Sequence, residues 1–111
     1  MVKRFAIPGD EIQPLAIGYG GCFATDMITV ENKGVGYMYR EEPDSDLDSG
    51  WRFFSGHESQ EYVDNAENTM IYDVNTIANY DAAILPFLAA AVGSAFERDP
   101  ETGEFLPVED V

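Results

Sequence analysis

The alternation of apolar and polar residues predicts several short strands and few long helices. Two stretches rich in β-branched and aromatic residues, Cys22 to Val30 and Val35 to Arg40, flank a run of turn-forming residues, a pattern typical of a β-hairpin. In the second stretch Val35, Tyr37 and Tyr39 share one face and Gly36, Met38 and Arg40 share the other, at the period of two of a half-buried strand. We therefore expect one of these two faces to pack on the core.

The aromatic run Trp51 to Phe54 predicts a further strand, in which Trp51 and Phe53 share a face and are core candidates. Other strands are expected at Met70 to Val74, Ser94 to Arg98 and Phe105 to Val108. The last two are joined by a connection rich in Gly, Pro and Asp, which favours a second hairpin.

Two short helices are predicted between these strands, at Thr76 to Tyr80 and at Ala82 to about Ala91. Side chains that can cap their N-termini are Asp73, Asn75 and Asp81. Pro86 lies deep in the second helix and is expected to kink it or make it restart, unless the helix begins near Leu85.

This order of elements indicates an α+β fold, with a mainly antiparallel sheet and one or two short helices packed on one side. The 111 residues suit a single domain spanning 1–111. Residues 1–20 mix Gly and Pro with isolated apolar side chains, so they are predicted to form an extended N-terminal arm with one short strand or turn. Residues 109–111 are predicted to fray.

Net charge narrows the classes of function. The chain has 21 Asp and Glu against 6 Lys and Arg, a formal charge of -15. Such a field repels phosphate backbones and anionic lipids, so we expect neither nucleic-acid nor membrane binding. The longest apolar stretch, Ala82 to Val92, contains a proline and is too short to span a bilayer. With no signal-peptide pattern and only one cysteine, the sequence favours the cytoplasm.

The segment Glu41 to Gly50 is the most acidic of the chain and is interpreted as a solvated loop. Its spacing Asp44, Asp46, Asp48 resembles an EF-hand calcium loop, but Ser49 takes the position of the required glycine and Ser55 that of the bidentate Glu. We therefore predict no metal site, with weak calcium binding as the alternative.

Catalytic patterns are weak. His57 is the sole histidine and lies in a polar loop, where an exposed residue is the simpler interpretation. Cys22 begins an apolar strand and is expected to be a small buried hydrophobe. Pairs of carboxylates could act as acid and base, yet chance pairs are numerous among 21 acids.

The arginines Arg40, Arg52 and Arg98 are each expected to pair with carboxylates.

Five segments together resemble the immunity-protein-33-like family of bacterial cytoplasmic proteins. They are Gly21-Cys22 with Thr25-Asp26, residues 35–41 (VGYMYRE), 48–54 (DSGWRFF), 71–80 (IYDVNTIANY) and 93–98 (GSAFER). The resemblance covers about Gly21 to Arg98. It implies a small α+β domain that neutralises a toxin of the polymorphic-toxin type, without a cofactor and without catalytic residues.

We therefore expect a non-enzymatic, immunity-type protein that occludes a protein partner, with a basic toxin as the candidate. An acidic loop speeds the encounter with a cationic partner by electrostatic steering. The residues expected to meet the partner are Glu41, Glu42, Asp44, Asp46 and Asp48, with Glu58, Glu61 and Asp64 as a second acidic segment. The alternatives are an acidic regulatory or scaffold module and a small carboxylate-dependent enzyme.

Overall fold

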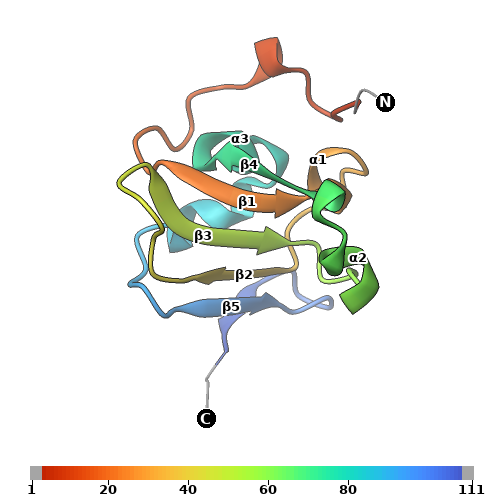
Figure 1. Cartoon of the computed structure of the whole chain (residues 1–111). Helices are drawn as coiled ribbons and strands as arrows, with labels where there is room; N and C mark the ends of the chain where they lie inside the picture. The colour runs from red at the N-terminus through yellow and green to blue at the C-terminus, as the bar shows by residue number, and fades with distance from the viewer. Residues whose placement is uncertain (1–3, 109–111) are drawn as a thin grey trace.

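The computed structural model of the protein describes residues 4–108. Within that range six strands form one sheet, and short helices connect them (Figure 1). The strands are β1 (Gly21–Thr25), β2 (Tyr37–Arg40), β3 (Asp48–Phe54), β4 (Thr69–Asp73), β5 (Ala95–Arg98) and β6 (Phe105–Pro107). The α-helices are α1 (Asp26–Thr29), α2 (Gln60–Asp64) and α3 (Val74–Tyr80). The 3₁₀ helices are η1 (Gly9–Glu11), η2 (Ala66–Asn68) and η3 (Ala82–Phe87).

The strand order in the sheet is β4-β1-β3-β2-β5-β6. β1 and β3 run parallel, whereas the other neighbouring strands pair antiparallel. The α+β class is confirmed, but the sheet is mixed because the neighbouring strands β1 and β3 point the same way. The predicted second hairpin is also confirmed, since β5 and β6 pair antiparallel.

The predicted first hairpin is wrong. β1 ends at Thr25 and the chain turns at once into α1, so that β3 and not β2 lies beside β1. The residues after Thr25 do not continue the strand. They form the single turn of α1, which buries Ile28 and Thr29. Over so few residues the periods of a strand and of a helix cannot be told apart.

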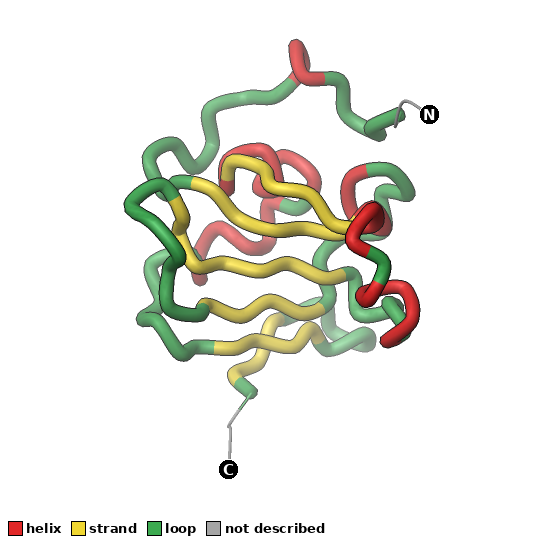
Figure 2. The backbone as a smooth tube through the Cα atoms, viewed as in Figure 1, coloured by secondary structure: helices red, strands yellow, loops and turns green. Residues whose placement is uncertain are grey.

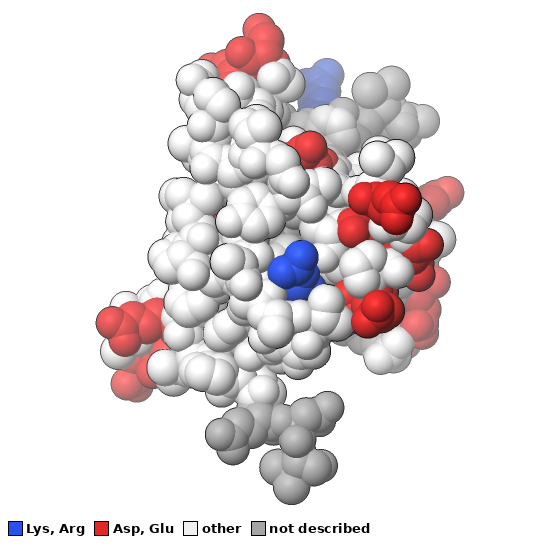
Figure 3. All heavy atoms as spheres, turned by 90° about the vertical axis from the view of Figure 1, so that its left-hand side faces the viewer, with Lys and Arg blue, Asp and Glu red and all other residues white. Residues whose placement is uncertain are grey.

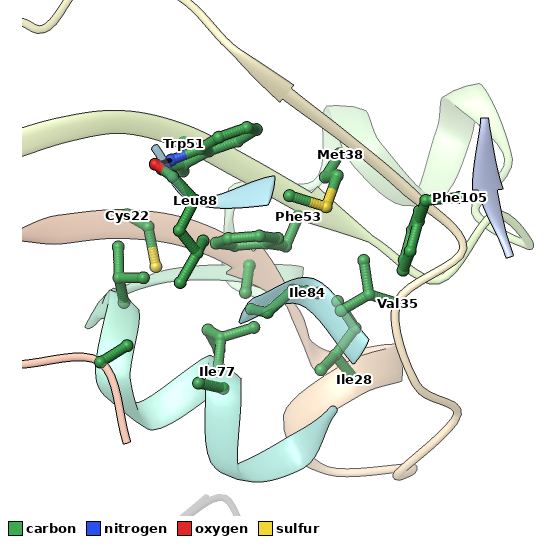
Figure 4. Packing of buried hydrophobic residues seen from close by; sticks show 14 residues of the cluster. Cys22, Ile28, Val35, Met38, Trp51, Phe53, Ile77, Ile84, Leu88 and Phe105 are labelled. Atoms are coloured by element: carbon green, nitrogen blue, oxygen red, sulfur yellow. Dashed lines mark hydrogen bonds between the residues drawn. The ribbon is translucent and has the colours of Figure 1, made fainter. Parts of the chain in front are cut away.

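The core lies between the sheet and the helical segments α3 and η3, which cover one face of it (Figure 2). Trp51 and Phe53 project from β3 into this layer and are fully buried, as predicted. They pack with Ile77, Ile84 and Leu88 from the helical side (Figure 4), and the Trp51 indole N–H donates to the Leu88 carbonyl at 3.1 Å. Burying each such side chain stabilises the fold by about 1.5–3 kcal/mol.

One face of β2 packs on the core, as predicted, and it is the face of Met38. Met38 is the residue of this strand that is fully buried, and it pairs with Phe53 of β3, so the two share the core side. Tyr37 and Tyr39 therefore lie on the opposite face and are only half-buried. Val35 is buried too, but it precedes the strand and does not follow its alternation.

The helix caps follow the sequence closely. Asp73 accepts a hydrogen bond from the Asn75 amide at the start of α3, and Asp81 accepts one from the Ala83 amide at the start of η3. The second predicted helix is a 3₁₀ helix that ends at Phe87, and it contains Pro86. Proline donates no backbone hydrogen bond, which favours a short, tight helix here.

The segment before the sheet, residues 4–20, is tied to α3 by amide side chains. The Asn75 carboxamide oxygen accepts from the Leu15 and Ala16 amides at 2.7 and 2.8 Å, and its nitrogen donates to the Gln13 carbonyl at 2.9 Å. The Asn79 side chain makes two further hydrogen bonds with the backbone of Gln13.

The predicted fraying of residues 109–111 falls outside the described residues. Within the described range, no helix has the length and apolar character needed to cross a membrane.

Candidate protein-binding face

The side of the sheet turned away from α3 and η3 carries no helical layer (Figure 2). Strand alternation places a mixed set of side chains on it, which we call the open face: Phe23, Tyr37, Tyr39, Arg52, Phe54 and Ile71. Strand register brings Ile71, Phe23, Arg52 and Tyr39 into one row across four strands. An uncovered sheet face with this many aromatic side chains is a candidate binding surface.

Arg52 is the centre of this row, and its side chain is only 3% exposed. Its guanidinium lies over the Phe23 ring, with Cζ 4.4 Å from the ring centroid. Nη1 and Nη2 donate to the two carboxylate oxygens of Asp48, each at 2.9 Å, and Nε donates to Glu41 Oε2 at 2.6 Å. The cation is therefore held by one aromatic ring and two carboxylates.

This pairing changes the proton affinity of both partners. The hydrogen bonds from Arg52 hold the pKa of Asp48 far below its usual range, against the opposing effect of burial. In return, hydrogen bonding to Asp48 and then to Glu41 raises the pKa of Arg52. Both groups are thus fully charged at neutral pH.

Asp48 also orders the acidic loop, which we define as residues 41–47. Its carboxylate accepts from the Asp44 and Gly50 amides, each at 2.9 Å. Residues 41–47 are exposed as predicted, but Asp48, Ser49 and Gly50 belong to β3, and the last two are buried. Among the described residues no group of three or more His, Cys, Asp and Glu is arranged to hold a metal ion.

A groove of about 730 Å³ lies between β2 and the segment that carries α2. Its aromatic lining consists of Tyr37, Tyr39 and Phe54, with the rings of Tyr39 and Phe54 stacked at 6.0 Å between centroids. Burial and then the neighbouring Glu41 raise the pKa of Tyr39, so its hydroxyl stays protonated and able to donate at neutral pH. His57 contributes to the rim and is exposed, as predicted.

The predicted partner-binding acids occupy both ends of β3. The acidic loop precedes this strand, whereas Glu58, Glu61 and Asp64 follow it, on or next to α2 (Figure 1). Glu58 accepts from the Thr25 hydroxyl and from the Ser55 and Gly56 amides. Burial alone would raise the pKa of Glu58, but these hydrogen bonds outweigh it and lower that pKa.

The eight acids predicted to bind the partner therefore differ in the contacts that they make within the fold. Glu41, Asp48 and Glu58 are engaged in contacts within the fold. Glu42, Asp44, Asp46, Glu61 and Asp64 are exposed. Figure 3 shows the end of the molecule that carries the acidic loop, where acidic side chains gather toward the edges and the surface between them is mostly uncharged.

The remaining arginines fulfil the pairing expectation in part. Arg98 pairs with Asp81, as predicted. Arg40 binds backbone carbonyl groups where a carboxylate was expected. Its guanidinium donates to the carbonyl oxygens of Ser49 and Ala90 at 2.9 and 2.8 Å and lies over Trp51. Cys22 is a buried hydrophobe, as expected, and burial raises the pKa of its thiol.

Sequence reasoning missed the aromatic groove and the exposed apolar side chains Leu47 and Ile71. The signal for the groove was the alternation of Tyr37, Met38 and Tyr39, in which either face could have been the inner one. Only the pairing of Met38 with Phe53 decides which face is buried.

These features define a small α+β domain with an uncovered aromatic sheet face and acidic side chains at both ends of its central strand. The model of the immunity protein Imm33 domain matches residues 22–109, and the chain therefore belongs to this family. The match includes all of β2 to β6 and nearly all of β1. Comparison with curated proteins and comparison with solved structures each gave no match.

Proposed function

We propose that this chain acts in the cytoplasm by binding a cognate bacterial toxin and occluding it. Membership of the Imm33 family supports an immunity-type role, with a protein partner and without catalytic activity of its own. The partner lies against the open face, and the acidic side chains at both ends of β3 attract it. The observation that supports this proposal is a sheet face without a helical layer, which carries half-buried aromatic side chains and has carboxylates near both ends of β3.

Charge favours a basic partner. A formal charge of -15 gives a long-range attraction for cationic proteins and raises their rate of association. The exposed acids Glu42, Asp44, Asp46, Glu61 and Asp64 are placed to make this contribution. Glu41, Asp48 and Glu58 instead fix the loops from which these side chains project.

Aromatic side chains then determine how long the complex lasts. Tyr37, Tyr39 and Phe54 offer large, half-buried rings that need little further ordering on binding. Tyr is among the residues that most often dominate interface energetics, because one ring combines apolar area with a hydrogen-bonding group. We therefore assign the steering to the acids and the lifetime of the complex to the rings.

The experiment is capture of the partner from the native bacterium on the tagged chain, at low and at high salt, with identification by mass spectrometry. The captured protein is then expressed in a bacterial host with and without this chain. We expect a basic protein that arrests growth, and growth that is restored by this chain. A captured protein that is harmless alone would instead support the regulatory or scaffold alternative.

Matched variants locate the surface. Asp44→Asn with Asp46→Asn should slow association several-fold at low salt, and Glu101→Gln with Glu104→Gln removes the same charge from the exposed β5–β6 turn as a control. Tyr37→Ala should mainly speed dissociation. Equal effects of the two charge pairs would mean that only net charge matters and that the acidic loop is not part of the contact.

A further inference from the structure

Two large apolar side chains on the surface line the same crevice. Leu47, in the acidic loop, is 82% exposed, and Ile71, on β4, is 69% exposed. They line a crevice of about 240 Å³ together with Phe23 of β1. Single exposed apolar residues are common, but these two come from distant parts of the chain and meet at one place. We call this site the Leu47 crevice.

The backbone holds this crevice in a fixed shape. The Gly21 amide donates to the Leu47 carbonyl at 2.7 Å, and the Ser49 hydroxyl donates to the Gly21 carbonyl at 2.6 Å. Gly20 has φ +101, and a Cβ there would lie 2.8 Å from the Leu47 carbonyl oxygen. The loop thus approaches β1 as closely as glycine allows, and little ordering remains to be done on binding.

The charged side chains that line the crevice are acidic. Of the residues that the structure describes, Asp44 and Asp48 line it, and no lysine or arginine does. The negative charge of Asp48 is compensated by Arg52, which donates two hydrogen bonds to it. Asp44 has an 84% exposed side chain and lies 4.0 Å from Arg52, at the limit of an ion pair. Its carboxylate therefore remains able to accept hydrogen bonds from a ligand.

Size and chemistry together select the occupant. The volume is below the ~300–1,000 Å³ of typical small-molecule sites and suits a single side chain. An apolar wall beside one carboxylate is complementary to a side chain with an apolar stem and a cationic end. A second copy of this chain is disfavoured as the source, because both copies would carry a charge of -15.

We infer that the Leu47 crevice receives one arginine side chain of the toxin, with its stem against Leu47 and Ile71 and its guanidinium on Asp44. This inference rests on the proposed function for the identity of the partner. Arginine fits better than lysine because its planar guanidinium can bind a carboxylate through two parallel hydrogen bonds.

The first test needs no toxin. The tripeptide N-acetyl-Ala-Arg-Ala-amide is titrated into methyl-labelled protein, and the methyl resonances of Leu47 and Ile71 are followed by NMR. We expect saturable shifts in the millimolar range with this peptide, weaker shifts with its lysine analogue, and none with its uncharged citrulline analogue. Asp44→Asn should abolish the shifts, whereas the neighbouring Asp46→Asn should retain them. Equal shifts with the citrulline peptide, or shifts confined to the Tyr37 groove, would overturn the inference.

The second test uses the captured toxin. Ile71→Arg fills the crevice with a cation and should weaken binding at least tenfold, while Leu106→Arg, at another exposed apolar position of the sheet, should not. Thermal melting checks that both variants fold. If the toxin binds wild type and Ile71→Arg equally, the crevice inference fails and the proposed function stands. If no toxin is captured, the proposed function fails and the peptide titration alone decides on the crevice.

Discussion

Arg52 donates two parallel hydrogen bonds to Asp48, which lies four residues earlier on the same strand. Such residues are normally too far apart along an extended strand to meet so directly. Here the register between β1 and β3 shifts. Gly21 pairs with Asp48 and Phe23 pairs with Arg52, so a step of two residues along β1 corresponds to a step of four along β3. The bulge includes Gly50, at φ +88, and it brings the two charges together.

The Asp48 pair should make stability depend on pH. The pKa of Asp48 is lowered in the folded protein, and the unfolded value is about 3.9. Its contribution is therefore complete above about pH 5 and is lost as the pH falls through about 4 toward the folded pKa. Asp48→Asn should cost about 1–3 kcal/mol at pH 7 and progressively less below pH 4, as measured by urea unfolding. Asp46→Asn is the control, and a loss that does not change with pH would contradict this assignment.

Replacing Arg52 should cost more than replacing either acid. Arg52→Met leaves Glu41 and Asp48 without their shared cation, and breaking a largely buried pair such as Arg52 with Asp48 typically costs about 3–5 kcal/mol. Arg52→Lys keeps the charge but loses the two-pronged geometry, so its loss should be intermediate. Adding Glu41→Gln and Asp48→Asn to Arg52→Met should recover part of the stability. Unfolding in urea at pH 7 would measure all three, and no recovery would argue that packing against Phe23 dominates.

Glycine-to-alanine substitutions should show how much stability depends on a positive φ angle and how much on close contact between two backbone segments. A Cβ at Gly50 would overlap the Glu41 carbonyl oxygen, and φ there is +88. A Cβ at Gly36 would overlap the Ser55 carbonyl oxygen, without the positive φ. A Cβ at Gly9 meets nothing within 4 Å. We expect melting temperatures to fall most for Gly50→Ala, clearly for Gly36→Ala and hardly for Gly9→Ala; equal values for all three would contradict the described backbone.

Cys22 should react only when the protein unfolds. Its side chain is 1% exposed, and burial, followed by the nearby Asp73, raises the pKa of its thiol. A thiol-specific reagent at pH 8 should therefore label it at the rate of unfolding, and labelling should become fast in strong urea. Fast labelling of the native protein would mean that β1 opens locally.

Asn75 should control the attachment of residues 4–20. Its carboxamide makes three hydrogen bonds to residues 13–16, and the side chain is almost fully buried. Asn75→Ala should cost about 1–3 kcal/mol because backbone groups are left unpaired. Limited chymotrypsin digestion should then cut within the arm, after Leu15 or Tyr19, much faster than in the wild type. Asn79→Ala, at a more peripheral amide, should have a smaller effect on the same digestion.

Local signals in the sequence were sufficient for local structure. Asp73 and Asp81 are followed by helical segments, so their role as caps could be predicted. Trp51 and Phe53 are two apart in a short aromatic run, and their shared burial followed from that spacing. The β5–β6 hairpin followed from the turn residues between its strands. Each of these features depends on residues close together along the chain.

The parts that could not be predicted depend on distant pairings. Nothing near β1 shows that its neighbour is the parallel β3, and this pairing decides that Phe23 meets Arg52. The sequence shows that Glu41 and Asp48 are acidic, but only the fold shows that both face the same buried arginine. Which acids remain available to a partner is therefore a tertiary property.

The position of β1 between β3 and β4 also affects the order in which the chain can fold. Both partners of β1 are synthesised after it, and the second of them ends only at Asp73. A nascent chain that stops before β3 leaves Cys22 and Ala24 without a neighbouring strand, so the segment that precedes β3 is not a folding unit. Pairings of this kind close long loops and fold more slowly than local hairpins. We conclude that the sheet assembles around β1 only after both β3 and β4 have left the ribosome.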